Sequence, residues 1–379
     1  MKVNLVAITY RDSYFFKKYG PAVRDLQILL TLSQIDNVTV TLLDRPVSIY
    51  ERVLGKICSF GIFSGFDIKV INTTSLDLIG PLRRRLWWKK SIPTFLDNLL
   101  PTLLKDDSIN VFLDFMPIGI PSTKSLDGWI YWYDFIDNFT KHNRFTAVER
   151  GSVALKYRFV KDNAKILTFV SSVCLSNVCA AEAVSAYRTV VTNKVFTDHA
   201  FGERVSPYDL HHVPKFDFGF IGFVTDKIDI EFLARLAPSF TIAIYGDFYD
   251  IEIKARLSVL PNVFLFGGFH YHDVPRICQS FKVGLLPYRE DKSHDGSPLK
   301  LYEYLRYLRP VLSSIDYELI DPIFIKNYKS SVLDDNDFRE LLELSGSDEI
   351  GLLLKHDDFL ISPMIEIIDA IKAGDVCSV

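Results

Sequence analysis

The segment from Phe281 to Ser314 constrains the fold of this chain more than any other. It begins with an apolar run that ends at Pro287-Tyr288, the pattern of a strand buried in a parallel sheet. A Gly-Ser-Pro break then opens a helix, in which we expect Ser297 as the N-cap and Pro298 at the first helical position. Val311-Leu312 returns as the next strand. Strand, helix and strand in this order predict one unit of a parallel α/β sheet.

Short apolar runs alternate with helical patterns along the rest of the chain as well. This alternation predicts doubly wound parallel sheets. In the first half we expect strands at Val3–Ile8, Val38–Leu43, Ile68–Ile71, Val111–Asp114, Ile130–Tyr133, Ile166–Val170 and Val190–Val191. In the second half we expect strands at Phe216–Ile221, Thr241–Tyr245, Val263–Phe266, Val283–Pro287 and Val311–Ser313. Helical patterns cover Pro21–Ser33, Val148–Val160, Ile230–Ala237, Val274–Ser280 and Pro298–Tyr307.

The polar segment from Thr192 to Lys215 interrupts this alternation, and we interpret it as the connection between two Rossmann-like domains. We expect an N-terminal domain over residues 1–195 and a C-terminal domain over 196–360. A helix at about 360–379 is expected to pack back on the first domain. The connection contains His199, His211 and His212, which are either solvated or ligands of a metal.

Composition excludes several classes of protein. A chain of 379 residues is long enough for two domains of ordinary size. With 48% hydrophobic and 24% charged residues it is globular, and a net charge of −4 gives no general attraction to nucleic acid. The five cysteines form no C-x-x-C pair, so we expect free, buried thiols. We see no signal peptide and no apolar span, so we expect a cytoplasmic protein.

The loop and helix after Tyr288 have the chemistry of an anion site. Lys300 and Glu303 lie one turn apart in the predicted helix, and Asp295 lies in the loop before it. A helix N-terminus attracts phosphate through its unpaired N–H groups. Together, these features indicate a site for an anionic, hydroxyl-rich ligand such as a nucleotide sugar.

The string S-P-L-K-L-Y-E-Y-L at 297–305 resembles the donor-binding motif of GT-B glycosyltransferases of family 4, especially teichuronic acid and xanthan glucuronosyl-type transferases. Asp295 and Glu303 have the spacing of that family's two acids, although the first acid is usually Glu. The residues from Thr192 to Phe201 resemble a further family element, with Lys194 in place of a glycine.

The resemblance implies two Rossmann-like doubly wound domains facing a central cleft, the GT-B arrangement. It implies that Lys300 faces the donor diphosphate and that Glu303 holds ribose hydroxyls. No cofactor and no metal are expected. The alternatives are a solvated helix lysine at Lys300 and a surface acid at Glu303.

Other loops at the carboxyl ends of the second-half strands complete the expected donor site. Gly222-Phe223 follows one strand, where the backbone can approach a diphosphate closely. Tyr271 follows another, in a loop that resembles the nucleobase loop of these transferases. Tyr288 ends a third. An ordinary strand-to-helix turn with Tyr271 as packing is the alternative at that loop.

The run from Trp129 to Phe139 resembles the Y-D-x-x-D-D-F element of the same relatives. An inverting transferase needs a carboxylate to take the proton of the attacking hydroxyl. We predict Asp137 as that base, with Asp134 as the alternative or as an orienting residue. In a retaining enzyme Asp137 would only hold the acceptor, and either acid could instead cap a turn. Tyr19-Gly20 precedes a helix and is either an acceptor-side loop or a simple turn.

A basic, aromatic segment lies between Gly80 and Leu104. Basic residues attract anionic headgroups and tryptophans settle at the membrane interface. We expect a peripheral membrane patch there, at the inner face of the plasma membrane; a solvated basic helix with buried tryptophans is the alternative. The predicted patch consists of Arg83, Arg84, Arg85, Trp87, Trp88, Lys89 and Lys90.

These interpretations lead to one expected function. The chain is expected to be a metal-independent glycosyltransferase that moves a sugar, with a UDP-sugar favoured, to a lipid-linked saccharide in surface polysaccharide synthesis. A nucleotide-sugar epimerase on the same fold and a non-catalytic glycan-binding partner subunit are the alternatives.

Overall fold

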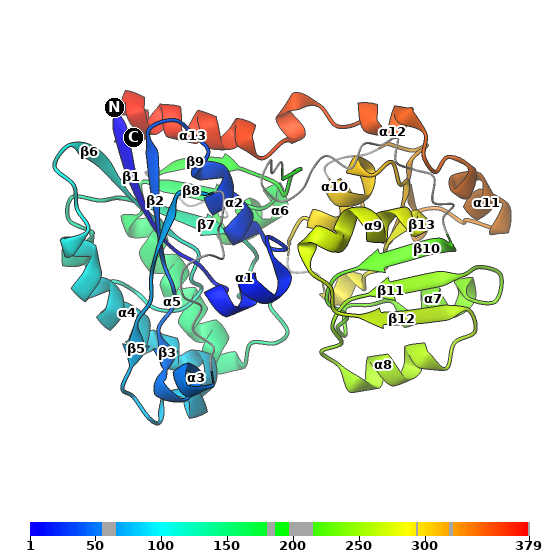
Figure 1. The fold of residues 1–379 in the computed structure, drawn as a ribbon, viewed down its shortest axis with the longest axis horizontal. Coiled ribbons are helices and arrows are strands. Elements are labelled where there is room, and N and C mark those ends of the chain that lie inside the picture. The colour runs from blue at the N-terminus through cyan, green and yellow to red at the C-terminus, as the bar shows by residue number, and fades with distance from the viewer. Residues whose placement is uncertain (55–65, 180–185, 197–214, 293–294, 318–320, 378–379) are drawn as a thin grey trace. The chain divides into compact units, whose positions relative to one another are not determined.

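The computed structural model describes residues 1–54, 66–179, 186–196, 215–292, 295–317 and 321–377, which form two compact units (Figure 1). The first unit comprises Met1–Thr192, residues 294–296 and Leu360–Val379. The second comprises Asn193–Ser293 and Ser297–Phe359. The division after Thr192 lies three residues before the expected boundary, and the C-terminal segment groups with the first unit.

A seven-stranded parallel sheet forms the centre of the first unit, in the order β4-β2-β1-β6-β7-β8-β9. All residues of β1 except the first are buried, because helices and loops cover both faces of such a sheet. The strands are β1 (Lys2–Ile8), β2 (Val38–Leu43), β4 (Ile68–Ile71), β6 (Ser108–Asp114), β7 (Ile130–Phe135), β8 (Ile166–Phe169) and β9 (Tyr187–Val190), beside a short pair, β3 (Val47–Ser48) and β5 (Thr74–Ser75).

The helices of the first unit follow the strands in sequence. The longest, α5, begins with a capping box between Thr146 and Glu149. The C-terminal helix α13 packs against α2. The α-helices are α1 (Ser13–Tyr19), α2 (Arg24–Leu32), α3 (Ile49–Val53), α4 (Trp88–Leu99), α5 (Ala147–Asn163), α6 (Ser172–Cys179) and α13 (Ile361–Ala373). The 3-10 helices are η1 (Gly80–Trp87), η2 (Leu100–Thr102), η3 (Thr123–Leu126) and η8 (Asp375–Cys377).

A six-stranded parallel sheet forms the centre of the second unit, in the order β12-β11-β10-β13-β14-β15. Its strands are β10 (Phe216–Ile221), β11 (Ile242–Tyr245), β12 (Val263–Gly267), β13 (Phe281–Leu286), β14 (Val311–Ser313) and β15 (Ile325–Asn327). Its helices are α7 (Ile230–Leu236), α8 (Ile251–Ser258), η5 (Tyr271–Asp273), α9 (Val274–Gln279), η6 (Glu290–Lys292), α10 (Leu299–Arg306), α11 (Asp335–Glu343), α12 (Asp348–Leu352) and η7 (His356–Asp358).

Each strand expected from the sequence is present, and β2, β4, β10 and β14 have the predicted bounds. The short strands β3, β5 and β15 were not predicted, because two or three residues carry no periodicity, and the seven-residue helix α1 was not predicted either. The predicted helix start was wrong by one residue: Pro298 is the N-cap of α10, and Ser297 lies before it.

Some expectations fall outside the described residues. These include His199, His211 and His212, most of the predicted connection, and Cys58. Of the cysteines that the structure describes, Cys174 and Cys278 are free and buried, as expected, and Cys179 is also buried. No described helix has both the length and the apolar character needed to cross a membrane.

A fully buried ion pair ties α5 to the sheet of the first unit. Lys156 Nζ lies 2.6 Å from Asp114 Oδ2 at the end of β6 and also donates to the carbonyl oxygen of Gly119. Asp114 accepts two further hydrogen bonds, from the Tyr131 hydroxyl and the Met116 N–H. Burial lowers the pKa of the Lys156 ammonium, and the attraction of Asp114 opposes that shift. The cost of burying each charge is therefore offset only as long as both Lys156 and Asp114 are present.

We expect Lys156→Met to lower the free energy of unfolding by about 3–5 kcal/mol, because it leaves the Asp114 carboxylate buried without a cation. Adding Asp114→Asn should recover part of the loss. Urea unfolding measures both values. The matched control is Lys2→Met, which removes an exposed ion pair with Asp107 at 3.4 Å and should change stability by about 0.5 kcal/mol at most. Equal losses for the two lysine variants would contradict this account.

Candidate functional site

Gly222 follows β10 and sets the geometry of the predicted donor site in the second unit. Its φ of 110° lies in the region that favours glycine, and its N–H donates to the carbonyl oxygen of Tyr245 at 2.8 Å. A Cβ added to Gly222 would lie 2.4 Å from Cε and 3.0 Å from Nζ of Lys300. Only glycine therefore lets the lysine side chain lie against this backbone.

Lys300 is half-buried among aromatic rings rather than beside an acid. Its ammonium lies 4.6 Å from the centroid of Phe220 and 5.1 Å from that of Tyr288, and it donates to the Tyr288 hydroxyl. Within the described ranges, no carboxylate forms an ion pair with it. Burial lowers the pKa of Lys300 to about 7. The site thus holds a poorly solvated cation, which a bound anion would stabilise.

Two buried oxygen atoms near the start of α10 have no hydrogen-bond partner in the described structure: Ser297 Oγ and Glu303 Oε2. Ser297 was expected to cap the helix with this hydroxyl, but only its carbonyl oxygen is engaged, by Asn193 Nδ2. The other carboxylate oxygen of Glu303 accepts from the Tyr271 hydroxyl. Burial raises the pKa of Glu303. Since buried polar atoms are nearly always paired, these two atoms are suited to a ligand.

The aromatic residues of the predicted site take different positions. Tyr271 begins η5, and its hydroxyl holds Glu303 while its ring centroid lies 6.3 Å from that of Phe196. Phe223 packs edge-on against Tyr249 at 5.0 Å. The structure therefore brings Gly222, Lys300, Ser297, Glu303, Tyr271 and Tyr288 together around the carboxyl ends of β10, β12 and β13 and the start of α10.

Asp134 and Asp137, the predicted base candidates of the first unit, have opposite environments. Asp134 lies inside β7, fully buried, and both its oxygens accept from Arg24, at 3.0 and 2.9 Å. Its Oδ2 also accepts from the Thr168 hydroxyl at 2.6 Å. Asp137 follows β7 and is half-buried. The Tyr157 hydroxyl accepts a hydrogen bond from the Phe139 N–H and donates one to the Asp137 carbonyl oxygen at 3.0 Å.

Asp295 was expected with the donor residues, but it groups with the first unit. Its carboxylate accepts from Asn138 at 2.8 Å and from Asn177 at 3.0 Å, and pairs with Lys141 at 2.9 Å. Its φ is 63°. Gly296 follows, and a Cβ there would lie 3.7 Å from Asp137 Oδ1. The Asp295 carboxylate is therefore fixed by residues of the first unit, and these bonds position Gly296 beside Asp137.

Tyr19 and Gly20 end α1 rather than preceding the first helix. Gly20 has a φ of 69°, and its N–H donates to the carbonyl oxygen of Phe16 at 2.7 Å. Tyr19 is buried against Phe15, with ring centroids 4.6 Å apart, and its hydroxyl accepts from Lys18. Both residues shape the loop after β1 through packing and backbone geometry.

A cluster of acids near the carboxyl ends of β1 and β2 was not predicted. Asp12 caps α1 and pairs with Arg45. Asp44 accepts from the Ser13 N–H and hydroxyl, and Asp25 accepts from the Arg11 N–H. Burial raises the pKa of both Asp25 and Asp44 to about 6. The position of Asp44 directly after an apolar strand was the available sequence signal.

Some residues of the predicted membrane patch are buried in the core, and others are exposed at the surface. Trp87 and Trp88 are only 4% and 8% exposed and belong to the hydrophobic core, so their indoles do not lie at a membrane interface in this structure. Arg85 packs over the Phe145 ring at 4.4 Å. The cations of the patch that remain exposed are Arg83, Arg84, Lys89 and Lys90.

No protein-family model and no curated protein sequence matches this chain. Solved structures resemble it along its whole length. AviGT4, a glycosyltransferase involved in avilamycin A biosynthesis, has 14% identity and a TM-score of 0.60, covering 100% of this chain and 99% of that chain. Sucrose-phosphate synthase from Thermosynechococcus elongatus has 10% identity and a TM-score of 0.64, covering 99% and 100%.

A UDP-forming alpha,alpha-trehalose-phosphate synthase from Burkholderia xenovorans, in complex with glucose-6-phosphate, has 12% identity and a TM-score of 0.63, covering 98% of this chain and 100% of that chain. At such identities the likeness concerns the fold. These neighbours are GT-B glycosyltransferases. The two Rossmann-like units of this chain therefore have the GT-B fold of glycosyltransferases.

Proposed function

We propose that this protein is a glycosyltransferase that moves a sugar from a nucleotide-sugar donor to a saccharide acceptor, with UDP-sugars favoured as donors. The fold supports this class of reaction. The observation that carries the proposal is the Lys300 ammonium, held against Gly222 without an acid partner in the described structure. Among the described residues, Ser297 Oγ just before α10 and Glu303 Oε2 within it have no hydrogen-bond partner.

The donor would bind in the second unit through its diphosphate and ribose. Lys300 would neutralise the diphosphate, and Gly222 lets the backbone approach it closely. Glu303, fixed by Tyr271, would accept from ribose hydroxyls through its unpaired oxygen. When the bond between the sugar and the diphosphate breaks, its electron pair leaves with the nucleoside diphosphate. A cation held there stabilises that growing charge more in the transition state than in the ground state.

Asp137 is our choice for the base. As the acceptor oxygen forms its bond to the anomeric carbon, its proton would pass to the Asp137 carboxylate. Asp134 is a poorer base because Arg24 and Thr168 already occupy its oxygens, and we propose it as a positioning residue of β7. If the reaction retains configuration, Asp137 would hold the acceptor instead.

The remaining parts of the proposal concern the biological setting. We propose a lipid-linked saccharide as the acceptor, in the synthesis of a surface polysaccharide such as O-antigen, capsule or exopolysaccharide. The enzyme would work without a metal and contact the inner face of the plasma membrane peripherally. Exposed cations at Arg84, Lys89 and Lys90 support the membrane contact, since anionic headgroups attract them. Unchanged turnover after treatment with a chelator would support metal independence.

The pKa of Lys300 gives a test of donor binding. Below pH 7 the ammonium is present in the free protein; above pH 7 it must gain a proton when a diphosphate binds. The Kd for UDP should therefore rise toward about tenfold per pH unit between pH 7 and 9. Calorimetry at pH 8 in buffers of different ionisation enthalpy should show uptake approaching one proton.

The matched control for this test is Lys300→Arg, whose guanidinium stays charged. Its Kd for UDP should vary little over the same pH range, whereas Lys300→Ala should bind UDP weakly at every pH. A panel of UDP, GDP and ADP identifies the nucleotide. Absence of binding to any of them would refute the proposed donor site.

The role of Asp137 is tested separately from donor binding. Asp137→Asn should lower turnover by about 100-fold or more, because no group takes the acceptor proton, and should leave the Kd for UDP unchanged. Initial rates of UDP release with an acceptor mixture measure turnover. Loss of UDP affinity in this variant would reassign the residue. Turnover of UDP-sugar without any acceptor would favour the epimerase alternative.

A further inference from the structure

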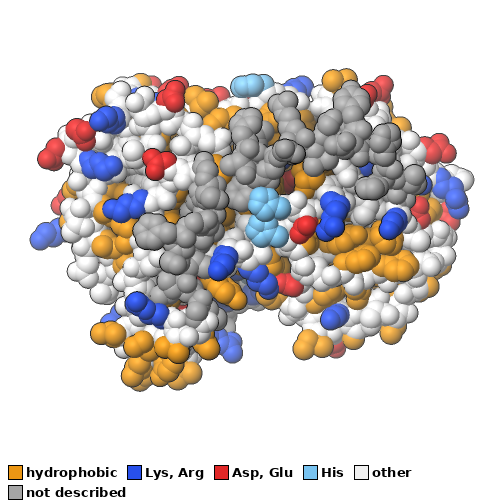
Figure 2. Space-filling view, in the orientation of Figure 1, with side chains coloured by type: hydrophobic (Ala, Val, Ile, Leu, Met, Phe, Trp, Pro, Cys, Tyr) orange, Lys and Arg blue, Asp and Glu red, His pale blue; other side chains and the backbone are white. Residues whose placement is uncertain are grey.

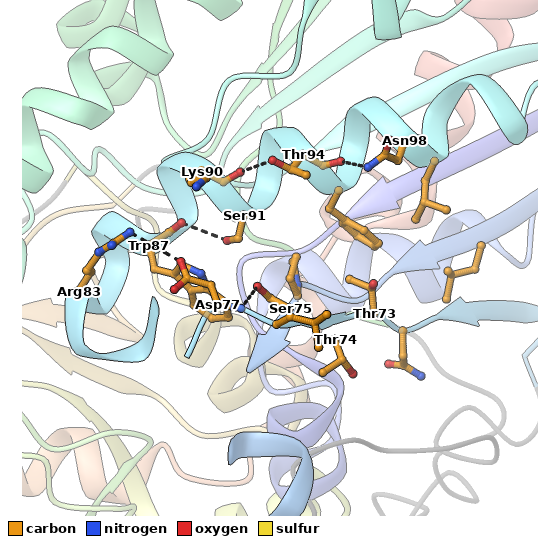
Figure 3. Close-up of a pocket in the computed structure, with 16 residues that line it drawn as sticks. Thr73, Thr74, Ser75, Asp77, Arg83, Trp87, Lys90, Ser91, Thr94 and Asn98 are labelled. Carbon is orange, nitrogen blue, oxygen red and sulfur yellow. Dashed lines mark hydrogen bonds and ion pairs between the residues drawn. The ribbon is translucent and has the colours of Figure 1, made fainter. Parts of the chain in front are cut away.

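The first unit contains a pocket of about 680 Å³, which none of the proposed donor or base residues line. It lies beyond the end of β4. Residues 72–77 form one wall, and η1 and α4 form the other (Figure 3). Ligands of open α/β sheets bind beyond the carboxyl ends of strands. The pocket therefore has the position of a binding site.

The α4 wall is rich in hydrogen-bond acceptors. Ser91, Thr94 and Asn98 lie along α4 where it borders the pocket. The Ser91 hydroxyl donates to the Trp87 carbonyl oxygen at 3.1 Å, and the Thr94 hydroxyl donates to that of Lys90 at 2.9 Å. Asn98 Nδ2 donates to the Thr94 carbonyl oxygen. Because these donors are used within the helix, the side-chain oxygens remain as acceptors for a ligand's hydroxyl groups.

The opposite wall and the floor also suit a saccharide. Thr73, Thr74 and Ser75 supply further hydroxyl groups across from α4 (Figure 3). Trp87 and Phe95 are buried and line the pocket with aromatic surface. A few placed polar groups over an apolar floor are typical of small-molecule sites. The C–H face of a sugar ring can pack on that floor while its hydroxyl groups bond to the walls.

The charged residues that line the pocket favour a ligand with one anionic group. Arg83 and Lys90 are its cations, and Asp77 is its acid. Asp77 lies 3.6 Å from Arg83 and offsets its charge. Lys90 is exposed and, in the described part of the chain, has no acidic partner. The excess of one positive charge matches a phosphate group on the ligand.

An exposed apolar segment continues from the pocket. Leu76 lines the pocket and is 79% exposed, and it is followed by Leu78, Ile79 and Leu82, of which Leu82 is 82% exposed. Figure 2 shows hydrophobic side chains gathered at the end of the first unit that carries β3, β5 and α3 in Figure 1 (lower left). Contiguous exposed apolar side chains mark interaction surfaces, and Arg84 adds a cation beside them.

We propose that this pocket binds the phosphate-bearing end of a lipid-linked saccharide acceptor, whose attacking hydroxyl at the other end would reach Asp137, while Leu78 and Leu82 enter the membrane surface. The inference rests on the proposed transfer function and specifies its acceptor. Basic side chains around the segment would meet anionic headgroups, and the leucines would enter the boundary of the acyl region. The membrane contact thus moves from the buried tryptophans to the leucines that precede them.

Vesicle sedimentation of the full-length chain tests the apolar segment. The vesicles are phosphatidylcholine with phosphatidylglycerol. Leu78→Asp/Leu82→Asp should lower partitioning by about tenfold or more, because two apolar side chains no longer enter the lipid. The matched control, Ile251→Asp/Val259→Asp, changes two exposed apolar residues of the second unit and should partition like the natural protein. Thermal unfolding confirms that both variants fold.

Adding polyprenyl-phosphate-linked glucose to the vesicles tests the pocket. It should increase partitioning of the natural protein, and Thr94→Phe, which fills the pocket from an exposed helix position, should abolish that increase while keeping the binding to plain vesicles. Unchanged partitioning of Leu78→Asp/Leu82→Asp, or an unchanged increase in Thr94→Phe, would overturn the proposal. So would glucose 1-phosphate binding as tightly as the lipid-linked sugar, since the ligand would then be soluble. UDP calorimetry reports on the donor site independently, so failure here is distinguishable from failure of the proposed function.

Discussion

The burial of the central strands of both parallel sheets on both faces is the constraint on which the rest of the structure depends. Strands such as β1 and β13 are almost wholly apolar, so functional polar groups are confined to the loops at their ends. Among the buried charged side chains, two pairs compensate each other: Lys156 with Asp114, and Asp134 with Arg24. Lys300 differs from both pairs because its partners in the described structure are aromatic rings and a hydroxyl. A poorly solvated cation of this kind is unfavourable until an anion arrives, which is the physical basis of the donor site proposed here.

Two aspartates of one short motif illustrate how strongly position within a strand decides chemistry. Asp134 is buried in β7 and bonded to Arg24 and Thr168, whereas Asp137 lies three residues later in the turn and is half-buried. The fixed one stabilises the strand end, and the other can exchange a proton with a ligand. Trp87 and Leu82 also differ in burial, because Trp87 packs in the core and Leu82 is exposed. In both cases the residue type alone does not tell which side chain is buried and which can meet a ligand or a membrane.

The first unit has two regions suited to a ligand, both at the carboxyl edge of its sheet. One is the turn around Asp137, next to Gly296; the other is the pocket beyond β4. The pocket has acceptor oxygens, aromatic surface and one excess positive charge, beside an exposed apolar segment. This combination matches an amphiphile with an anionic, hydroxylated head better than it matches a free sugar, because a free sugar would not use the leucines. The donor chemistry of the second unit is independent of this choice.

The sequence by itself determined the positions of the longer strands and their alternation with helices, because apolar runs between turn residues report burial directly. It also placed Gly222 directly after a strand and Glu303 inside the helix that follows the Gly-Ser-Pro break. Only the tertiary structure decided that the Ser297 hydroxyl has no partner among the described residues, that Asp295 groups with the first unit, and that Trp87 and Trp88 are core residues. These outcomes depend on contacts between residues far apart in the chain, such as Asn138 with Asp295, which local periodicity cannot encode.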